Sequence, residues 1–285
     1  MYIEHMDYPE LDKIIDIDAI CFNRVKKKTR YRMEELFYIS NEGAFVGKEN
    51  GEIIAFLFTH TYGKYSVIGP LGVVNEKSGQ GNGKQIIRHA ITYLKTKGVE
   101  KINIEVLPDI SKNIGLYLKL GFQFEKPTLQ IAIVDNHFQH ERNIICGDQI
   151  DRGLVLSFLI KIYEETNGFS FNNDVNRVFE VDPSCLFFYL YKNEVVGFLG
   201  YYERLYDYAF GYFEPCCKKD TILSLYKSLC KKCQRDDLSI RVNSSNYMFL
   251  SKLKDSIKIE KVIERMIYSD KSKEDETFII RSFVG

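Results

Sequence analysis

Three glycines alternate with polar residues at the start of a predicted helix, in the segment SGQGNGK over residues 78–84. Glycine adopts positive φ angles and lets the backbone approach a ligand closely. The N–H groups in the first turn of a helix have no intrahelical partner, and they lie at the positive end of the helix dipole. The segment therefore predicts an anion cradle suited to phosphate or pyrophosphate.

The spacing of these glycines separates the loop from two common nucleotide-binding motifs. Glycines at 79, 81 and 83 match neither the G-x-x-x-x-G-K-[ST] pattern of a P-loop nor the G-x-G-x-x-G pattern of a dinucleotide fold. On this loop alone, a glycine-rich turn that binds no ligand is an alternative.

The surrounding residues alternate between strand and helix patterns, which predicts a mixed α/β fold. Two helical segments come first, followed by a hairpin around Asn50-Gly51, a further strand and the glycine loop. The helix after the loop has one apolar face and ends at a suitable cap, Gly98. The elements are expected at 10–22, 30–40, 45–48, 53–60 and 65–74, then from the glycines to 97, at 101–107, from 111 to 121, and from 122 onward.

The second half of the chain repeats this order weakly. Residues 191–199 align with 49–57 once one turn residue is absorbed, and a strand at 238–242 corresponds to the strand at 101–106. Because element order and spacing both agree, we expect duplication of a whole domain, although any two α/β segments share some likeness. The second copy has no alternating glycines before its helix, so we expect it to hold no phosphate in the same way.

This duplication divides the chain into two expected domains. The first spans residues 1–134 and the second spans residues 151–285. Residues 135–150 between them are polar and irregular, which is typical of a linker.

Composition argues against several classes of function. Lys plus Arg and Asp plus Glu both number 39, and a chain of zero net charge is not suited to coating nucleic acid or an anionic membrane. We expect no signal peptide, because the first residues include acids and no apolar h-region. We expect no membrane span, because no uninterrupted apolar run is long enough to cross a bilayer. Seven scattered cysteines indicate reduced thiols and a cytoplasmic protein. Zinc at the cysteines between 216 and 233 is disfavoured, because their C-x-x-C pair lies in a helical pattern.

A second motif, NIGLYLKLGF, follows at residues 113–122. With it, the chain resembles the GNAT superfamily of N-acyltransferases. The run LGVVNEKSGQGNGKQII is similar to the acyl-CoA-binding motif of that family, and LYLKLGF is similar to its following helix and strand. The two motifs occur in the family's order, and the close match covers roughly residues 45–134. The resemblance implies two tandem GNAT-like domains, the second of them degenerate.

The resemblance also implies acetyl-CoA as cosubstrate. Backbone amides of the glycine loop would bind its pyrophosphate, and the strand that ends at Leu71 and Val73 would hydrogen-bond the pantetheine arm. Ser78 stands where the family usually has Arg or Gln, and Ile110 stands where it often has Asn, with Asn113 close by. The expected cofactor-binding residues are Leu71, Gly72, Val73, Ser78, Gly79, Gln80, Gly81, Asn82, Gly83, Lys84 and Asn113.

The same resemblance gives Tyr117 the role of the tyrosine that protonates the departing thiolate. A phenol with a pKa near 10 remains a neutral donor beside a thiol with a pKa near 8.5. An aromatic anchor in an amphipathic helix is the alternative for Tyr117. The attacking amine must also lose a proton, and the strand at 65–74 holds no acid. Glu105 on the next strand is therefore the nearest candidate base, with His60 or a chain of waters as alternatives.

Together these features predict an N-acetyltransferase that transfers acetyl from acetyl-CoA to a primary amine by direct attack, without a metal. A non-catalytic acyl-CoA sensor or a partner-binding scaffold is the alternative. A basic run at residues 24–30 falls where the family borders its acceptor site, and it is either a solvated loop or an attractor of anionic acceptors. The acceptor, a small molecule or a peptide, is not specified by the sequence, and a homodimer is compatible with it.

Overall fold

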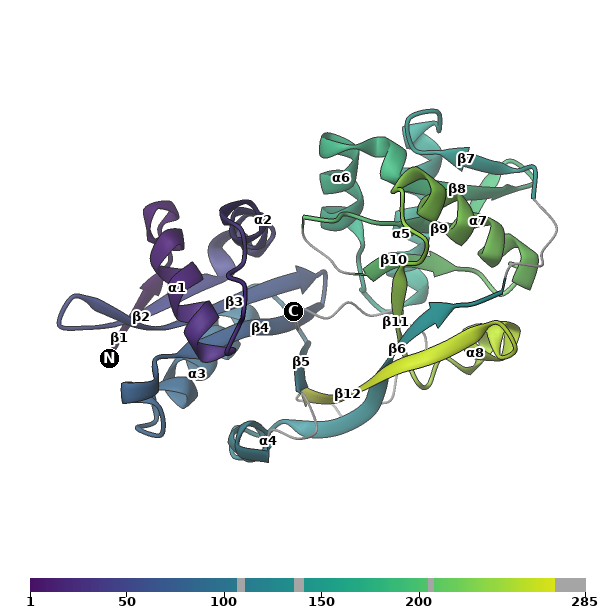
Figure 1. The fold of residues 1–285 in the computed structure, drawn as a ribbon. Helices are drawn as coiled ribbons and strands as arrows, with labels where there is room; N and C mark the ends of the chain where they lie inside the picture. Colours follow the sequence, from purple (N-terminus) through teal and green to yellow (C-terminus); the bar gives the residue numbers. More distant parts are fainter. Residues whose placement is uncertain (107–110, 136–140, 205–207, 270–285) are drawn as a thin grey trace. The chain divides into compact units, whose positions relative to one another are not determined.

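The computed structural model describes residues 1–106, 111–135, 141–204 and 208–269. These residues form two compact units (Figure 1). Among them, unit 1 contains residues 1–124 and the end of the last strand, 266–269. Unit 2 contains residues 125–265.

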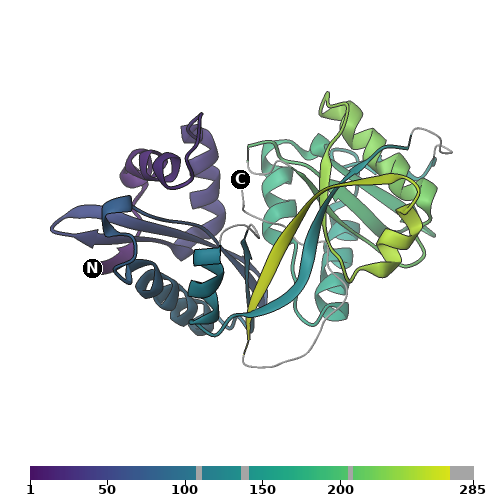
Figure 2. The same ribbon diagram turned by 60° about the horizontal axis from the view of Figure 1, so that its bottom comes forward.

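Unit 1 is built on a sheet in the order β1 to β5. Strands β1 to β4 pair antiparallel, and β5 runs parallel to β4. Two helices, α1 and α2, cover one face of this sheet and α3 covers the other (Figure 2). The elements are β1 (Tyr2–His5), α1 (Leu11–Cys21), α2 (Arg30–Ser40), β2 (Ala44–Glu49), β3 (Glu52–Tyr62), β4 (Tyr65–Val73), α3 (Asn82–Thr96), β5 (Lys101–Val106) and α4 (Ser111–Leu118).

The core of unit 1 lies between α3 and the sheet. The apolar stripe of α3 packs against side chains of β3, β4 and β5, because residues three and four apart share one face of a helix. Met266 from the end of β12 (Ile257–Ser269) is fully buried in the same core. The buried members include Leu57, Ile68, Ile86, Ile87, Ala90, Leu94, Ile102, Ile104 and Phe122.

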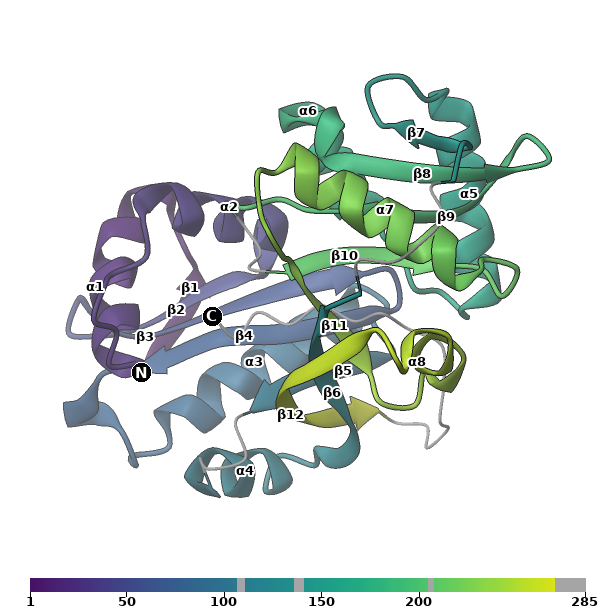
Figure 3. The ribbon, with the colours of Figure 1, turned by 45° about the vertical axis from the view of Figure 1, so that its right-hand side comes forward.

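Unit 2 repeats the same plan. Strands β7 to β10 pair antiparallel, β11 runs parallel to β10, and β6 pairs antiparallel with β11. Figure 3 shows α7 lying across β8 and β9. The elements are β6 (Gln123–Ile133), β7 (Ile144–Cys146), α5 (Arg152–Glu165), α6 (Asn172–Val181), β8 (Leu186–Tyr191), β9 (Glu194–Gly200), β10 (Tyr208–Phe213), α7 (Lys219–Lys232), β11 (Ser239–Asn243), α8 (Tyr247–Leu253) and β12.

The tandem α/β fold expected from the sequence is confirmed. The order strand, two helices, three strands, helix, strand, helix, strand occurs from β1 to β6 and again from β7 to β12. Each copy has a parallel pair at the corresponding place, β4 with β5 and β10 with β11. Two independent folds would not be expected to agree in both order and strand direction.

The boundary between the two compact units differs from the expected domain bounds at residues 134 and 151. β6 begins in unit 1 and continues in unit 2, and β12 begins in unit 2 and ends in unit 1. In addition, β7 lies inside the segment 135–150 and pairs with β8. The apolar pattern of a strand does not indicate which sheet the strand joins. The sequence therefore could not show to which unit β6, β7 and β12 belong.

Two broader findings concern the described residues only. None of their helices combines the length and the apolar character that crossing a bilayer requires. They also contain no group of three or more His, Cys, Asp or Glu side chains arranged to hold a metal ion.

Candidate functional site

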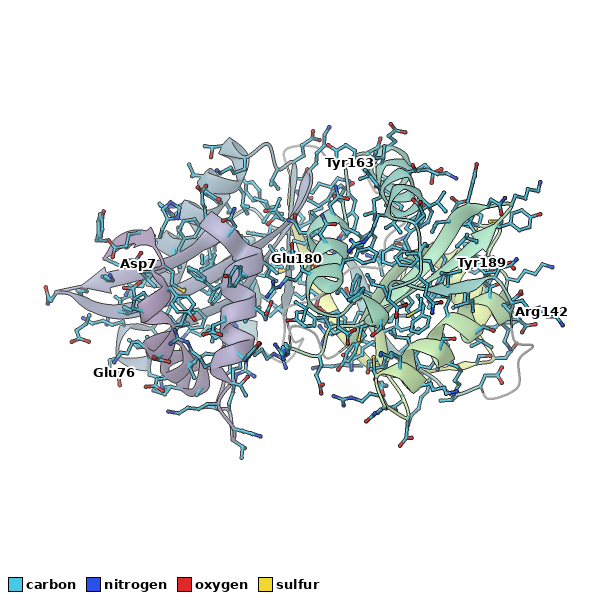
Figure 4. The ribbon with its side chains drawn as sticks, turned by 90° about the horizontal axis from the view of Figure 1, so that it is seen from above. Asp7, Glu76, Arg142, Tyr163, Glu180 and Tyr189 are labelled. Atoms are coloured by element: carbon cyan, nitrogen blue, oxygen red, sulfur yellow. The ribbon has the colours of Figure 1, made fainter. Side chains whose placement is uncertain are left out.

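The glycine loop connects the end of β4 to the start of α3. A 3-10 turn at Asn75–Lys77 follows the strand, and its Glu76 is labelled at the edge of unit 1 in Figure 4. Gly79 and Gly81 have φ angles of +79° and +87°. Glycine adopts this left-handed region without the steric cost that a Cβ imposes, so the loop bends sharply into the helix.

Six consecutive backbone N–H groups of this loop, at residues 79–84, are available to a ligand. The N–H of Ser78 donates to the carbonyl of Asn75 at 3.1 Å, and that of Gln85 donates to the carbonyl of Gly81 at 3.0 Å. Between these two positions, no backbone N–H donates to any part of the chain that the structure describes. The free groups lie at the N-terminal end of the α3 dipole, and they form an anion cradle.

Two side chains of the loop, those of Gln80 and Asn82, stabilise it through hydrogen bonds to the preceding turn. The amide of Gln80 donates to the carbonyl of Glu76 at 2.8 Å, and the amide of Asn82 donates to the carbonyl of Lys77 at 3.0 Å. Both bonds close onto the 3-10 turn that precedes the loop. Gln80 and Asn82 therefore fix the loop with their side chains and leave their backbone N–H groups for the ligand.

Lys112 brings a positive charge to the cradle from α4. Its ammonium lies 3.1 Å from the hydroxyl of Ser78, a residue 34 positions earlier in the chain. This places a cation beside the residue that stands where GNAT sequences usually carry Arg or Gln. Sequence reasoning missed Lys112 because no local pattern joins two residues so far apart. Asn113, the next residue, is half-buried, and no hydrogen bond links it to the described loop.

The strands β4 and β5 diverge beyond Val67 and Asn103. Their parallel pairing runs from Tyr65 with Lys101 to Val67 with Asn103, and then ends although both strands continue. On its other side, β4 stays paired with β3 as far as Val73. An open strand edge accepts an extended ligand through backbone hydrogen bonds. Leu71 and Val73, both half-buried, lie on this diverging part of β4.

Gly72 has a packing role on the opposite face. A Cβ at this position would lie 2.3 Å from the ring of Phe56 and 3.1 Å from the sulfur of Cys21. No side chain fits there without a shift of its neighbours. Gly72 therefore allows α1 to pack closely on β4, and the neighbouring Leu71 and Val73 keep their place at the open edge.

Tyr117 of α4 is buried against the core of unit 1, with 6% of its surface exposed. Its ring centroid lies 5.9 Å from that of Phe122. Burial raises the pKa of Tyr117 to about 12, because a phenolate is poorly stabilised away from water. The described residues give its hydroxyl no hydrogen-bond partner. Tyr117 therefore carries a proton throughout the physiological range.

Glu105 lies on the other face of the sheet. Ile102, Ile104 and Val106 of β5 belong to the α3 core, so the alternation of a strand turns Asn103 and Glu105 toward the side covered by α1 and α2. Glu105 is buried, with 8% of its surface exposed. No interaction joins Glu105 to Tyr117 in the described structure. The two candidates for proton transfer thus belong to opposite faces of β5.

His60, the alternative base, is buried on β3 in the same row as Asn103. It lies opposite Val67 of β4, and Val67 lies opposite Asn103 of β5. The ring of His60 is 4.4 Å from that of Tyr62 between centroids. His60 on β3 is two strands away from Glu105 on β5. The edge where β5 diverges from β4 is therefore nearer to Glu105 than to His60.

The basic run at residues 24–30 is only partly solvated. Asp18 of α1 is fully buried and accepts hydrogen bonds from Arg24 at 2.5 Å and from Lys28 at 3.1 Å. Burial lowers the pKa of Lys28 to about 8, against the raising effect of Asp18. The expectation of a solvated loop holds for Lys26 and Lys27, which are exposed. The loop is therefore anchored at Asp18 and presents these two lysines outward.

The corresponding place in unit 2 is built differently. The helix α7 follows Lys218 at its N-cap and lacks a left-handed glycine there. The ammonium of Lys252, from α8, donates to the carbonyls of Pro215 and Cys217 at 2.7 Å each. Beside it, the rings of Phe213 and Phe249 stack with centroids 5.8 Å apart. A lysine that donates to two carbonyl oxygens thus stands in the turn before α7, where unit 1 has its glycine loop.

Comparison with known proteins agrees with this geometry. Residues 11–122 match the model of the acetyltransferase (GNAT) family. No curated protein matches the sequence. Residues 11–122 are therefore similar to the GNAT family in sequence, and the structure shows the same element order a second time.

Solved structures share the fold over nearly the whole chain. An acetyltransferase candidate from Pyrococcus horikoshii is 16% identical, with a TM-score of 0.66 over 99% of this chain and 94% of that one. A GCN5-related N-acetyltransferase from Sphaerobacter thermophilus is 10% identical, with a TM-score of 0.63 over 96% of this chain and 97% of that one. At these identities the likeness establishes the tandem fold, and the chemistry is argued from the residues.

Proposed function

We propose that the protein is an N-acetyltransferase that uses acetyl-CoA and transfers its acetyl group to a primary amine by direct attack. The observation that carries this proposal is the row of six free N–H groups at residues 79–84, which follows directly on the diverging strand β4. A phosphate-binding loop joined to an open strand edge fits a ligand with a pyrophosphate at one end and an extended amide-bearing arm at the other.

The pyrophosphate and the pantetheine arm of coenzyme A each have matching groups in unit 1. The N–H groups of residues 79–84 hold the pyrophosphate, and Lys112 adds a counter-charge beside Ser78. The open edge of β4 near Leu71 and Val73 binds the pantetheine arm. In unit 2, Lys252 fills the equivalent place, so we infer one cofactor for each chain.

Glu105 and Tyr117 lie on opposite faces of β5, so each is assigned a separate proton transfer. Glu105 takes a proton from the acceptor ammonium on the face covered by α1 and α2. The amine nitrogen then forms a bond to the thioester carbonyl carbon and loses a second proton to solvent, and the carbon–sulfur bond breaks. Tyr117 gives its proton to the departing sulfur from the α3 side, and solvent returns a proton to Tyr117. A buried phenol with a raised pKa suits this role, because it is protonated before each turnover.

A cytoplasmic location is part of this proposal. All seven cysteines are free thiols, which fits the reducing compartment where acetyl-CoA is used. The thiols are not needed for the reaction as written.

The experiment is an acetylation assay with acetyl-CoA and a panel of primary amines, including amino acids, polyamines and peptides. Free thiol and acetylated amine are measured together, the first by a thiol reagent and the second by mass. Equal amounts of both support transfer of the acetyl group from acetyl-CoA to the amine. Tight acetyl-CoA binding with neither product would favour an acyl-CoA sensor, and thiol without acetylated amine would indicate hydrolysis.

A further inference from the structure

Asn103 is a buried polar side chain whose carbonyl oxygen has no partner. Only 3% of the residue is exposed, and its Oδ1 makes no hydrogen bond within the described structure. A buried amide oxygen without a partner destabilises a fold, because the hydrogen bond that it made to water is lost. A cost of this kind is retained most readily where a ligand restores the bond.

The position of Asn103 in the sheet suggests which ligand that is. The residue forms the last pair between β4 and β5, opposite Val67, and beyond it the two strands diverge. Its side chain shares a face of β5 with Glu105, two residues further on. Asn103 therefore stands where the strands begin to separate, on the side from which the proposed base would receive the acceptor.

We propose that the side-chain carbonyl oxygen of Asn103 accepts a hydrogen bond from the attacking amine and positions its nitrogen for transfer. This inference rests on the proposed function. An amide oxygen is too weakly basic to take the proton, so Asn103 orients the nitrogen while Glu105 deprotonates it. A primary ammonium has three N–H groups, of which one goes to Glu105 and another to Asn103.

The same contact selects amines over alcohols. A hydroxyl group has one hydrogen, and that hydrogen goes to the base. Asn103 Oδ1 would then face a lone pair of the attacking oxygen and remain without a hydrogen bond. A buried group that pairs with only one of two similar substrates discriminates strongly between them.

The test compares the wild type with Asn103→Leu and Asn103→Asp. Leucine has nearly the same volume without polar atoms, and aspartate keeps oxygen acceptors. The substrate is the amine of the panel with the highest turnover, alongside the alcohol of matching structure. We expect Asn103→Leu to lower kcat/KM for the amine at least tenfold, mainly by raising its KM, and to reduce the amine-to-alcohol ratio. Asn103→Asp should keep a KM for the amine close to that of the wild type.

Two further measurements distinguish a role of Asn103 in positioning the amine from a role in stabilising the fold. Acetyl-CoA affinity, measured by calorimetry, should be the same in the wild type and in Asn103→Leu. The Tm of Asn103→Leu should be unchanged or higher, because the substitution removes an unpaired buried oxygen. A lower Tm with an unchanged KM for the amine would overturn the proposal and assign Asn103 to the fold.

The remaining outcomes are also decisive. An active wild type with an equally active Asn103→Leu variant overturns the role of Asn103 and leaves the proposed function standing. A wild type that binds acetyl-CoA but acetylates no amine of the panel overturns both. A parallel loss of acetyl-CoA affinity in Asn103→Leu would place the effect in the cofactor site and contradict the inference.

Discussion

The ammonium of Lys252 lies 2.7 Å from the carbonyl oxygen of Pro215, in the part of unit 2 that repeats the anion cradle of unit 1. A second bond of the same length reaches the carbonyl of Cys217. In unit 1 the equivalent loop presents free N–H groups. The turn before α7 has no left-handed glycine, so its backbone lacks the sharp loop that presents the N–H groups in unit 1.

Replacing Lys252 with Met should therefore lower stability without opening a second cofactor site. Two hydrogen bonds from a charged donor are lost, and we expect unfolding to become easier by about 1–3 kcal/mol. Urea unfolding measures the stability, and calorimetry measures the number of acetyl-CoA sites. A second site in Lys252→Met would show that the lysine alone closes unit 2, contrary to the expectation that the missing glycine loop prevents binding.

Gly81→Ala should weaken acetyl-CoA binding by roughly tenfold, because a Cβ disfavours the left-handed φ of +87° and the loop must shift. Gly98→Ala is a matched control at the other end of α3. It has a φ of +79°, and neither position has an atom within 4 Å of an added Cβ. The two variants should lose similar stability, about 1 kcal/mol, while only the first loses affinity. Equal affinities in the two variants would exclude the loop as the binding site.

Local patterns in the sequence predicted the framework of this site. Turn residues at Asn50-Gly51, the apolar stripe of α3 and the glycine loop all depend on neighbours within a few positions, so periodicity and turn chemistry locate them. Helices α1 and α2 and strands β2 to β5 lie close to their expected bounds.

Contacts between distant residues were not predictable in this way. The approach of Lys112 to Ser78, the closure of unit 2 by Lys252, and the burial of Met266 in the core of unit 1 all depend on the tertiary fold. The case of Asn103 is similar, because it lies in a strand of alternating polar and apolar residues, and the burial of its side chain without a partner appears only after packing.

Tyr117→Phe should lower kcat by about 10²-fold and leave acetyl-CoA affinity unchanged, because only the transition state requires the proton. Tyr93→Phe, at a half-buried tyrosine of α3 that packs against Phe45, is the matched control and should retain full activity. Stopped assays at saturating acetyl-CoA give kcat, and calorimetry gives the affinity. Full activity in Tyr117→Phe would leave the tyrosine as a core anchor only.

The pH profile provides a separate check on Tyr117. Since its pKa lies near 12, the wild type should show no loss of kcat from deprotonation of this residue between pH 7 and 10. A loss of kcat in this range that is absent from Tyr117→Phe would contradict the burial of the phenol.

Lys112→Gln should weaken acetyl-CoA binding by a few fold and reduce its dependence on salt, because an exposed cation contributes through a screened interaction. Lys119→Gln, another exposed lysine close by in the chain, should change neither quantity. Affinities measured at two salt concentrations distinguish the variants. The same salt dependence in Lys112→Gln and in the wild type would remove Lys112 from the cofactor site.

Stability should rise with pH above about 8 because of Lys28. Its pKa is lowered in the folded state, so between pH 8 and its ordinary value the unfolded chain binds more protons. The free energy of unfolding should increase from this group by about 2 kcal/mol between pH 7.5 and 9.5. Lys28→Met should lack this increase in urea titrations at the two pH values. Parallel pH curves for variant and wild type would rule out a lowered pKa for Lys28.

The most direct measurement is a calorimetric titration of acetyl-CoA into the purified wild-type protein. One site per chain is expected, carried by the free N–H groups of residues 79–84 in unit 1, with unit 2 closed by Lys252. Two sites would contradict the closure of unit 2. No binding at high micromolar acetyl-CoA would contradict the cofactor site itself, and with it the proposed acetyl transfer.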